Sequence, residues 1–317
     1  MTLCVALRAH AFNDLGHYVS AKLAYGQLTD AQRESVHRTL KNHPHYAEYL
    51  AASVPPSTTE REWSFLRAAA WADWIRSHHR AEFHKSEWHY INYPYKLREP
   101  VPAVLPEPLE QPGGNILRQL ALAKQVAIDP ASAELGLGGA FTPDQKRALA
   151  LTWLFHLTGD LHQPLHVVAL IDDTRFPRET HGDQGGNKLA IVAQGTRPTR
   201  LHAFWDGALG SDSRYENVVK LTEALWVLPV SLPELSSHAT IESWAKESYE
   251  LAVQEVYQNG NLQIAEWKPA YDRAGATAGP DVPVFSDAMK DSARAVSQRR
   301  LILAGRRLAR QLAEIYP

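Results

Sequence analysis

The stretch LTWLFHLTGDLHQPLHVVAL, residues 151–170, places three histidines and one aspartate in an otherwise apolar segment. Such a segment is expected to be buried, and imidazoles and carboxylates are costly to bury without partners. On a helix, His156 and Asp160 stand four positions apart and project from one face. Pro164 cannot continue that helix, and the turn it imposes can bring His166 toward the same point. The fold must therefore enclose these groups as a hydrogen-bonded core, an acid–base set or a set of metal ligands.

Four other short segments place the same residue types in apolar or aromatic surroundings. They are FNDLGHY with His17, AAAWADWIRS with Asp73, EWHYINY with His89, and RLHAFWDG with His202 and Asp206. Each residue taken alone is more often a hydrogen-bonded core group. Together, in a chain with 15 histidines and one cysteine, they favour a metal site and exclude disulfide chemistry. Imidazole and carboxylate without thiolate suit zinc sites that keep positions open for water.

The periodicity of apolar residues predicts one mainly α-helical domain. Helical spacing covers residues 14–27, 30–43, 60–80, 111–127, 143–162, 211–226, 240–258 and 286–315. The segment KLAIVAQG, residues 188–195, is the best candidate for a strand, and residues 92–114 and 172–187 are predicted to form long loops. No linker or internal repeat divides the 317 residues, so a single domain is expected.

The first eleven residues, MTLCVALRAHA, resemble the end of a secretory signal peptide. An apolar run precedes Ala9-His10-Ala11, which fits the A-x-A cleavage pattern. We therefore expect residues 1–11 to be removed and residues 12–317 to form a secreted or periplasmic bacterial protein. No apolar run approaches the roughly 20 residues that a membrane-spanning helix needs. The net charge of −2 excludes a generally basic surface, so any site for a polyanion must be local.

These segments together resemble the zinc-dependent S1/P1 nuclease family of secreted single-strand nucleases and 3′-nucleotidases. The motifs FNDLGH, WAD, WHYIN, FHLTGDLHQPLH, GGNK and LHxxWD run in family order from residue 12 to residue 206. The segment RRLILAGRRLARQLAEIY near the C-terminus is similar to the last helix of the family. The resemblance implies an all-α, multi-helical fold of the zinc phospholipase C and S1/P1 nuclease type, with at most a minor β-hairpin.

The resemblance also implies three zinc ions in a cleft and assigns their ligands. The first zinc would be bound by Asp73, His89, His156 and Asp160. The second would be bound by His166, His202 and Asp206. The third would be bound by the α-amino and carbonyl groups of Phe12, by His17, and by Asp160 as a bridge. Three Zn²⁺ ions would outweigh the three aspartates and give an acidic protein a positive site for phosphate.

Further residues take their roles from the same resemblance. Asp73, Arg76 and Asp160 are the expected catalytic residues, with Arg76 on phosphate. Tyr90 would stack on a base, and Asn92 and Asn187 would make polar contacts with nucleotide. His162 lies in the motif outside the ligand set, and we expect a structural or second-shell hydrogen bond from it. The chain departs from the family at Phe12, where tryptophan is usual, and at Asn92, where fungal members have aspartate.

The implied activity is hydrolysis of phosphodiester bonds in single-stranded DNA and RNA by a zinc-activated hydroxide, leaving 5′-phosphates. 3′-Mononucleotides are further expected substrates, and a monomer without a stable protein partner or membrane association is expected. One alternative is a zinc-dependent phospholipase C, although those enzymes have glutamate where this chain has Asp206. Another alternative is a non-catalytic zinc-binding protein, for which only His78, His79 and His84 offer a histidine-rich surface.

Overall fold

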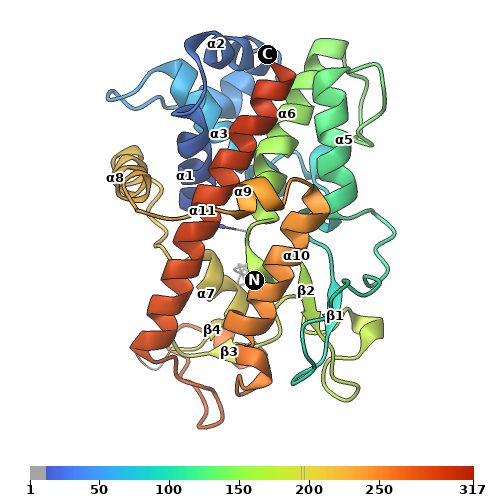
Figure 1. The fold of residues 1–317 in the computed structure, drawn as a ribbon, viewed down its shortest axis with the longest axis vertical. Helices are drawn as coiled ribbons and strands as arrows, with labels where there is room; N and C mark the ends of the chain where they lie inside the picture. The colour runs from blue at the N-terminus through green and yellow to red at the C-terminus, as the bar shows by residue number, and fades with distance from the viewer. Residues whose placement is uncertain (1–11, 194, 196) are drawn as a thin grey trace.

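The computed structural model describes residues 12–193, 195 and 197–317, so the predicted signal remnant at residues 1–11 lies outside the described residues. The fold is all-α, as predicted (Figure 1). The α-helices are α1 Asp14–Tyr25, α2 Asp30–Leu40, α3 Glu60–Trp74, α4 Arg80–Phe83, α5 Ile116–Ile128, α6 Pro143–Asp160, α7 Leu201–Asp206, α8 Tyr215–Trp226, α9 Glu234–Ser237, α10 Ile241–Leu251 and α11 Asp287–Ile315. None of the helices among the described residues is both long enough and apolar enough to span a bilayer.

Short turns of other helical types connect these elements. Two are π-helical, η1 Tyr46–Leu50 and η6 Ala252–Val256. The 3-10 turns are η2 Ile75–Ser77, η3 Ser86–His89, η4 Pro164–His166, η5 Arg178–Thr180, η7 Gln258–Gly260 and η8 Pro269–Asp272.

Side-chain caps set several of the helix ends. Thr142 caps α6 in a capping box with Gln145, and Pro143 occupies the first turn. Asn115 caps α5, so this helix begins five residues later than the 111–127 prediction. The helix predicted over 60–80 ends earlier, at Trp74, and continues as the 3-10 turn η2.

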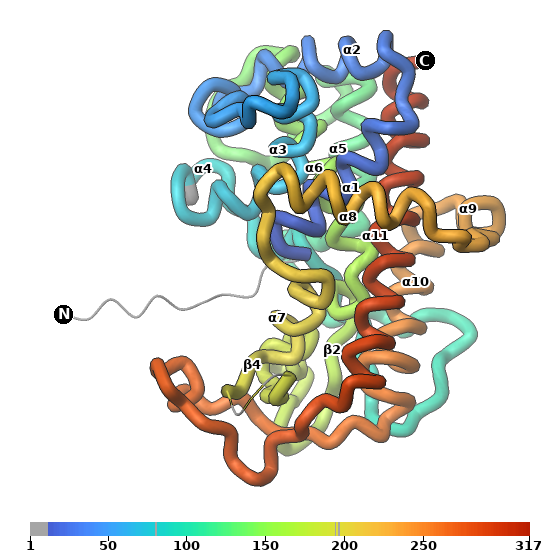
Figure 2. The backbone as a smooth tube through the Cα atoms, turned by 90° about the vertical axis from the view of Figure 1, so that its left-hand side faces the viewer, coloured from blue at the N-terminus to red at the C-terminus, as the bar shows by residue number. Residues whose placement is uncertain are grey.

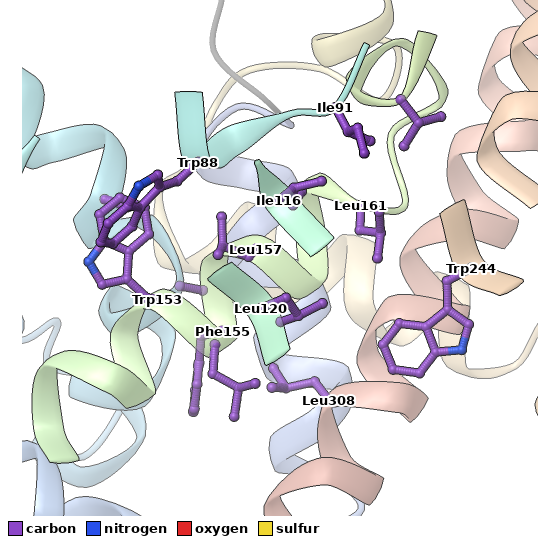
Figure 3. Close-up of a cluster of buried hydrophobic side chains, with 14 of the residues drawn as sticks. Trp88, Ile91, Ile116, Leu120, Trp153, Phe155, Leu157, Leu161, Trp244 and Leu308 are labelled. Atoms are coloured by element: carbon purple, nitrogen blue, oxygen red, sulfur yellow. The ribbon is translucent and has the colours of Figure 1, made fainter. Parts of the chain in front are cut away.

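Helix α6 is the centre of the fold. Every residue from Ala148 to Asp160 is buried, as expected for a helix surrounded by others on all sides. It packs against α3, α5 and α11, and α1 packs against α3 and α11. Figure 3 shows the apolar side chains around it, including the edge-on pair of Trp88 and Trp153.

The strands are few and very short. β1 Tyr93–Tyr95 pairs in parallel with β2 Val168–Leu170, and β3 Ala190–Ile191 pairs antiparallel with β4 Thr199–Arg200. The all-α prediction with at most a minor hairpin is confirmed: β3 and β4 form a small antiparallel pair, and β1 and β2 add a second small sheet that is parallel. The predicted strand at 188–195 is reduced to Ala190–Ile191, and the predicted loop at 92–114 contains β1. Segments of two or three residues carry too little alternation to be recognised from sequence.

The β1–β2 pairing has a consequence for the predicted site. The backbone N–H of Ile91 donates to the carbonyl of His166 at 2.8 Å, which aligns the segment after His89 with the turn after Pro164. Figure 2 shows α7, β2 and β4 together in the lower half of the molecule, below α1, α3 and α5. The His- and Asp-containing segments come from both halves, so they meet where the halves join.

Candidate metal centre

Asp160, the last residue of α6, is the centre of the first group of side chains. Its Oδ1 lies 3.2 Å from His17 Nε2, and its Oδ2 lies 3.1 Å from His156 Nε2 and 2.9 Å from His89 Nδ1. His17 is on the second turn of α1, and His89 ends the turn η3. All four residues are buried. The predicted shared helix face of His156 and Asp160 is confirmed, and two other elements complete the group.

Asp73 on α3 extends this group. Its Oδ1 lies 3.9 Å from His156 Nε2 and 3.0 Å from Arg76 Nη2. One ligand atom from each of Asp73, His89 and His156 lies within 4.8 Å of the other two, and the same holds for His17, His156 and Asp160. The two sets share His156 and are thus parts of one continuous cluster.

A second group brings together His166, His202 and Asp206, whose ligand atoms also lie within 4.8 Å of one another. His202 and Asp206 are four positions apart on α7, with His202 Nε2 3.6 Å from Asp206 Oδ2. His166 ends the 3-10 turn that begins at Pro164, and its ring centroid is 5.0 Å from that of His202. The turn predicted at Pro164 is confirmed.

Three of the histidines are held in the tautomer that leaves Nε2 able to bind a metal. A backbone carbonyl can only accept a hydrogen bond, so an imidazole nitrogen facing it carries the proton and the other nitrogen keeps its lone pair. Three Nδ1 atoms donate in this way: His156 to Ala69 O at 2.7 Å, His166 to His89 O at 2.6 Å, and His202 to Gly185 O at 2.7 Å. In each ring, Nε2 is left with its lone pair toward the ligand groups.

Several buried polar atoms in the two groups make no hydrogen bond. They are both ring nitrogens of His17, His89 Nε2, Asp160 Oδ1, His166 Nε2 and Asp206 Oδ2. A buried polar group without a hydrogen bond costs about 1–3 kcal/mol. A divalent cation would compensate several of these atoms at once, and their nitrogen and oxygen donors are the ligand types that zinc accepts. The residues present therefore fit a metal.

Burial also sets the protonation states that a metal needs. It lowers the pKa of His89 and His202 to about 3, and lowers that of His17 and His166 below the ordinary value. These imidazoles are thus neutral at pH 7 and able to bind a cation. Asp206 is the exception, because burial and the carboxylates of Asp73 and Asp160 raise its pKa well above the usual range, and a bound cation would have to displace its proton.

Comparison with known proteins identifies the family. Residues 12–317 match the family model described as S1/P1 Nuclease. The chain belongs to the S1/P1 nuclease family. Endonuclease 4 of Arabidopsis thaliana is 31% identical over 181 residues, which cover 53% of this chain and 50% of that protein. Endonuclease 2 of the same plant is 25% identical over 331 residues, covering 99% of this chain and 93% of that protein. The match thus spans about half the length of Endonuclease 4 and nearly all of Endonuclease 2.

Phe12 and Asn13, where the described residues begin, lie next to the second ligand group. The backbone N–H of Asn13 lies 3.5 Å from the carbonyl of Asp206. Phe12 is buried, and its side chain leaves no room for a Cβ at Gly16, which would come within 2.7 Å of it. The position predicted to provide a terminal amine is therefore next to the second ligand group.

The residues predicted to contact nucleotide are placed less uniformly. Arg76 lies beside Asp73, and its side chain is 19% exposed. Tyr90 directly follows His89 and is half-buried, whereas Asn92 is buried with 4% exposure. Asn187 donates from Nδ2 to the carbonyl of Gln184 within its own loop. Of these four, Arg76 contacts a predicted metal ligand, Asp73, through its side chain.

Two residues that shape the second ligand group were not predicted from the sequence. Gln163 donates from Nε2 to Asp206 Oδ1 at 2.8 Å, and the only signal for it was its position inside the histidine-rich stretch. Gly185 has a φ of +57°, and a Cβ there would lie 2.3 Å from the carbonyl of Leu165. The glycines of the GGNK motif thus allow the loop to approach closely enough for its carbonyl to fix His202.

One further cluster of histidine and glutamate differs from the two ligand groups. His45, Glu48 and His79 offer ligand atoms within 4.8 Å of one another, and His79 Nε2 lies 3.0 Å from Glu48 Oε2. The indole N–H of Trp71, however, donates to His45 Nδ1 at 3.2 Å. Neutral His45 therefore carries its proton on Nε2, opposite to His156, His166 and His202. This cluster is a hydrogen-bonded group and a poor metal site.

Proposed function

We propose that this chain is a zinc-dependent nuclease that hydrolyses phosphodiester bonds in single-stranded DNA and RNA and leaves 5′-phosphate ends. The observation that carries the proposal is the set of buried imidazole and carboxylate atoms that make no hydrogen bond and face one another. Membership in a nuclease family supports the reaction class. Release of phosphate from 3′-mononucleotides is part of the same proposal, because it breaks the same ester bond at O3′.

Three zinc ions account for the ligand atoms. Asp73, His89, His156 and Asp160 would hold one, and His166, His202 and Asp206 a second. His17, Asp160 and the backbone of Phe12 would hold the third. When bound, zinc lowers the pKa of water to about 7 and offsets negative charge on phosphate. A chain of net charge −2 gains in this way the local positive charge that a polyanion needs.

The side chains of this protein would then orient and bind the substrate. Arg76 reaches the partly exposed side of the cluster, and its planar guanidinium can donate two hydrogen bonds to a phosphate. Asp73 forms an ion pair with Arg76 and thereby orients the guanidinium. Tyr90 would stack on a base, with Asn92 and Asn187 as polar contacts. A base in a duplex must first be unstacked and unpaired for this, which favours single strands.

We also infer that the active chain begins at Phe12 and is secreted or periplasmic. An α-amine is a metal ligand, whereas the amide nitrogen of a longer chain is a poor one. The 3.5 Å contact between Asn13 N and Asp206 O supports this, because it brings the start of the chain to the ligand groups. A chain that retains residues 1–11 should therefore have much lower activity than one that begins at Phe12.

The deciding experiment uses the chain that begins at Phe12, loaded with zinc and incubated with circular single-stranded DNA. We expect cleavage that EDTA abolishes, products with 5′-phosphates, and slower cleavage of the same DNA as a relaxed duplex circle. An Arg76→Lys variant should bind zinc normally but cleave more slowly, since lysine cannot form the paired hydrogen bonds. An intact circle in the presence of three zinc ions per chain would overturn the proposal, and phosphatidylcholine would be the next substrate tested.

A further inference from the structure

The two carboxylate oxygens of Asp206 have different environments. Oδ1 accepts a hydrogen bond from Gln163 Nε2 at 2.8 Å. Oδ2 is buried without a hydrogen bond and lies 3.6 Å from His202 Nε2. A carboxylate that rotates freely could present either oxygen to a cation. Here the amide of Gln163 occupies one oxygen and leaves the other facing the histidines.

Gln163 also connects Asp206 to the turn that carries His166. Its Oε1 accepts from the backbone N–H of Leu165, and its backbone carbonyl accepts from the N–H of His166 at 3.0 Å. The side chain is fully buried. Only one orientation of the amide satisfies both partners, because the N–H of Leu165 requires an oxygen and the carboxylate requires a donor. The side-chain amide of Gln163 therefore bonds Asp206 at one end and the backbone beside His166 at the other, while the backbone carbonyl of Gln163 bonds His166 itself.

We propose that Gln163 is the positioning residue of the second metal site. It fixes which oxygen of Asp206 faces the cation and sets the separation between Asp206 and His166. The inference rests on the zinc assignment in the proposed function. Groups that orient metal ligands typically change metal affinity by about 10- to 100-fold when they are removed, and we expect an effect of this size.

The test compares Gln163→Met and Gln163→Glu with a matched variant, Gln311→Met. Gln311 is also a buried glutamine, and it donates to Thr158 Oγ1 of α6 at 3.1 Å, but that partner is not among the predicted ligands. Zinc per chain is counted after dialysis against a weak chelator, and the affinity of the weakest site is measured by chelator competition. Melting temperatures of the metal-free proteins show whether each variant folds.

We expect three zinc ions in the wild type and in Gln311→Met, and two in Gln163→Met. Gln163→Glu should bind the second-site zinc more weakly still, because it places a second carboxylate against Asp206 Oδ1. If Gln163→Met does not fold, Gln163→Asn replaces it, since it keeps an amide that is too short to reach both partners. Wild-type zinc content and affinity in the folded variants would overturn the inference. Three tightly bound zinc ions in a wild type that cleaves no nucleic acid would overturn the proposed function alone.

Discussion

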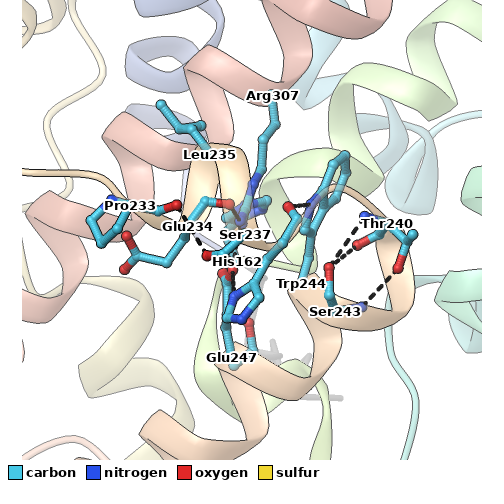
Figure 4. A network of polar contacts seen from close by, with 12 residues as sticks. His162, Pro233, Glu234, Leu235, Ser237, Thr240, Ser243, Trp244, Glu247 and Arg307 are labelled. Atoms are coloured by element: carbon cyan, nitrogen blue, oxygen red, sulfur yellow. Dashed lines mark hydrogen bonds and ion pairs between the residues drawn. The ribbon is translucent and has the colours of Figure 1, made fainter.

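Two buried polar regions lie at the same end of α6, and their buried carboxylates are compensated in opposite ways. The first, here called the metal cluster, surrounds Asp160 and consists of the two ligand groups. The second, here called the arginine network, joins the segment after α6 to α10 and α11 and consists of His162, Glu247, Ser248, Arg300 and Arg307. Figure 4 shows His162, Glu247 and Arg307 of this network. Only two positions separate Asp160 from His162, so one segment of chain enters both regions.

In the arginine network the chain supplies its own cations. Glu247 accepts hydrogen bonds from both Arg300 and Arg307, and Arg307 Nη1 donates to His162 Nε2 at 2.8 Å. Ser248 donates to the carbonyl of Leu161, and Arg300 Nε donates to that of His162 at 3.0 Å. The expected structural hydrogen bond of His162 is confirmed, and these contacts satisfy the carbonyls of the two residues that follow α6.

In the metal cluster the described residues supply few cations. Burial lowers the pKa of His89 and His202 to about 3, whereas Asp160 and Asp73 outweigh burial and raise the pKa of His156. Arg76 is the cation in contact with Asp73. The comparison shows that burial of charge is not itself a sign of function. The sign is a set of buried ligand atoms that lie close to one another while several of them make no hydrogen bond.

The largest effect should come from removing the central carboxylate. Asp160→Asn takes an anionic ligand from two of the proposed zinc ions, and we expect activity to fall by at least about a hundredfold, since even outer groups can cost that much. Zinc per chain should fall with it, whereas the metal-free protein should melt close to the metal-free wild type. Zinc analysis, DNA cleavage and calorimetry in EDTA check these three outcomes. Full activity in Asp160→Asn would contradict the conclusion that the metal cluster, unlike the arginine network, serves the reaction.

The complementary substitution in the arginine network should affect stability. Glu247→Ala leaves Arg300 and Arg307 buried without their anion, which should cost about 3–5 kcal/mol in the free energy of unfolding. Denaturant unfolding in EDTA measures it. Glu250→Ala on the same helix is the control, because Glu250 makes only a half-exposed pair with Lys246, and it should change stability by less than about 0.5 kcal/mol. Equal losses of stability in Glu247→Ala and Glu250→Ala would contradict the conclusion that Glu247 is the anion that stabilises the two buried arginines.

A smaller effect should appear in the pH dependence of stability. Burial would raise the pKa of Glu247, but Arg307 and Arg300 outweigh it and hold the pKa below the ordinary value of 4.5. A carboxylate with a lowered pKa stabilises the fold above its unfolded pKa and loses this contribution as pH falls through the folded value. The difference in stability between wild type and Glu247→Gln should thus be constant above about pH 6 and shrink below pH 4.5. Unfolding curves at several pH values measure it, and a difference that grows in acid would contradict the pairing.

The smallest effect is expected at the cluster of His45, Glu48 and His79. His79→Ala removes a partly exposed pair with Glu48, which should be worth no more than about 1 kcal/mol. Zinc content and DNA cleavage should stay at wild-type values, because the lone pair of His45 Nδ1 accepts from Trp71 and its Nε2 carries the proton. Metal analysis of this variant beside Asp160→Asn tests the tautomer argument. Loss of one zinc ion in His79→Ala would show that this cluster is a metal site as well.

The sequence predicted the helical class and much of the first ligand group. The spacing of His156 and Asp160 fixed their shared face, because the helical repeat determines which side chains project together. Pro164 determined the turn before His166, since proline cannot continue a helix. The cap at Thr142 and Pro143 located the start of α6. These rules depend only on neighbouring residues in the sequence, and they located helices wherever a segment was long enough to show the helical repeat of apolar residues.

The tertiary structure decided which distant groups meet and which protonation states they take. Nothing in the local sequence distinguishes His45, which accepts from Trp71, from His202, which donates to Gly185 O. The pairing of β1 with β2 is likewise too short to leave a pattern, although it aligns His89 with His166. Gln163 gains its role only because α7 brings Asp206 to it. The sequence thus determined which residues could bind a metal, whereas packing determined which nitrogens and oxygens face one another, because tautomer, burial and contact are properties of neighbours in space.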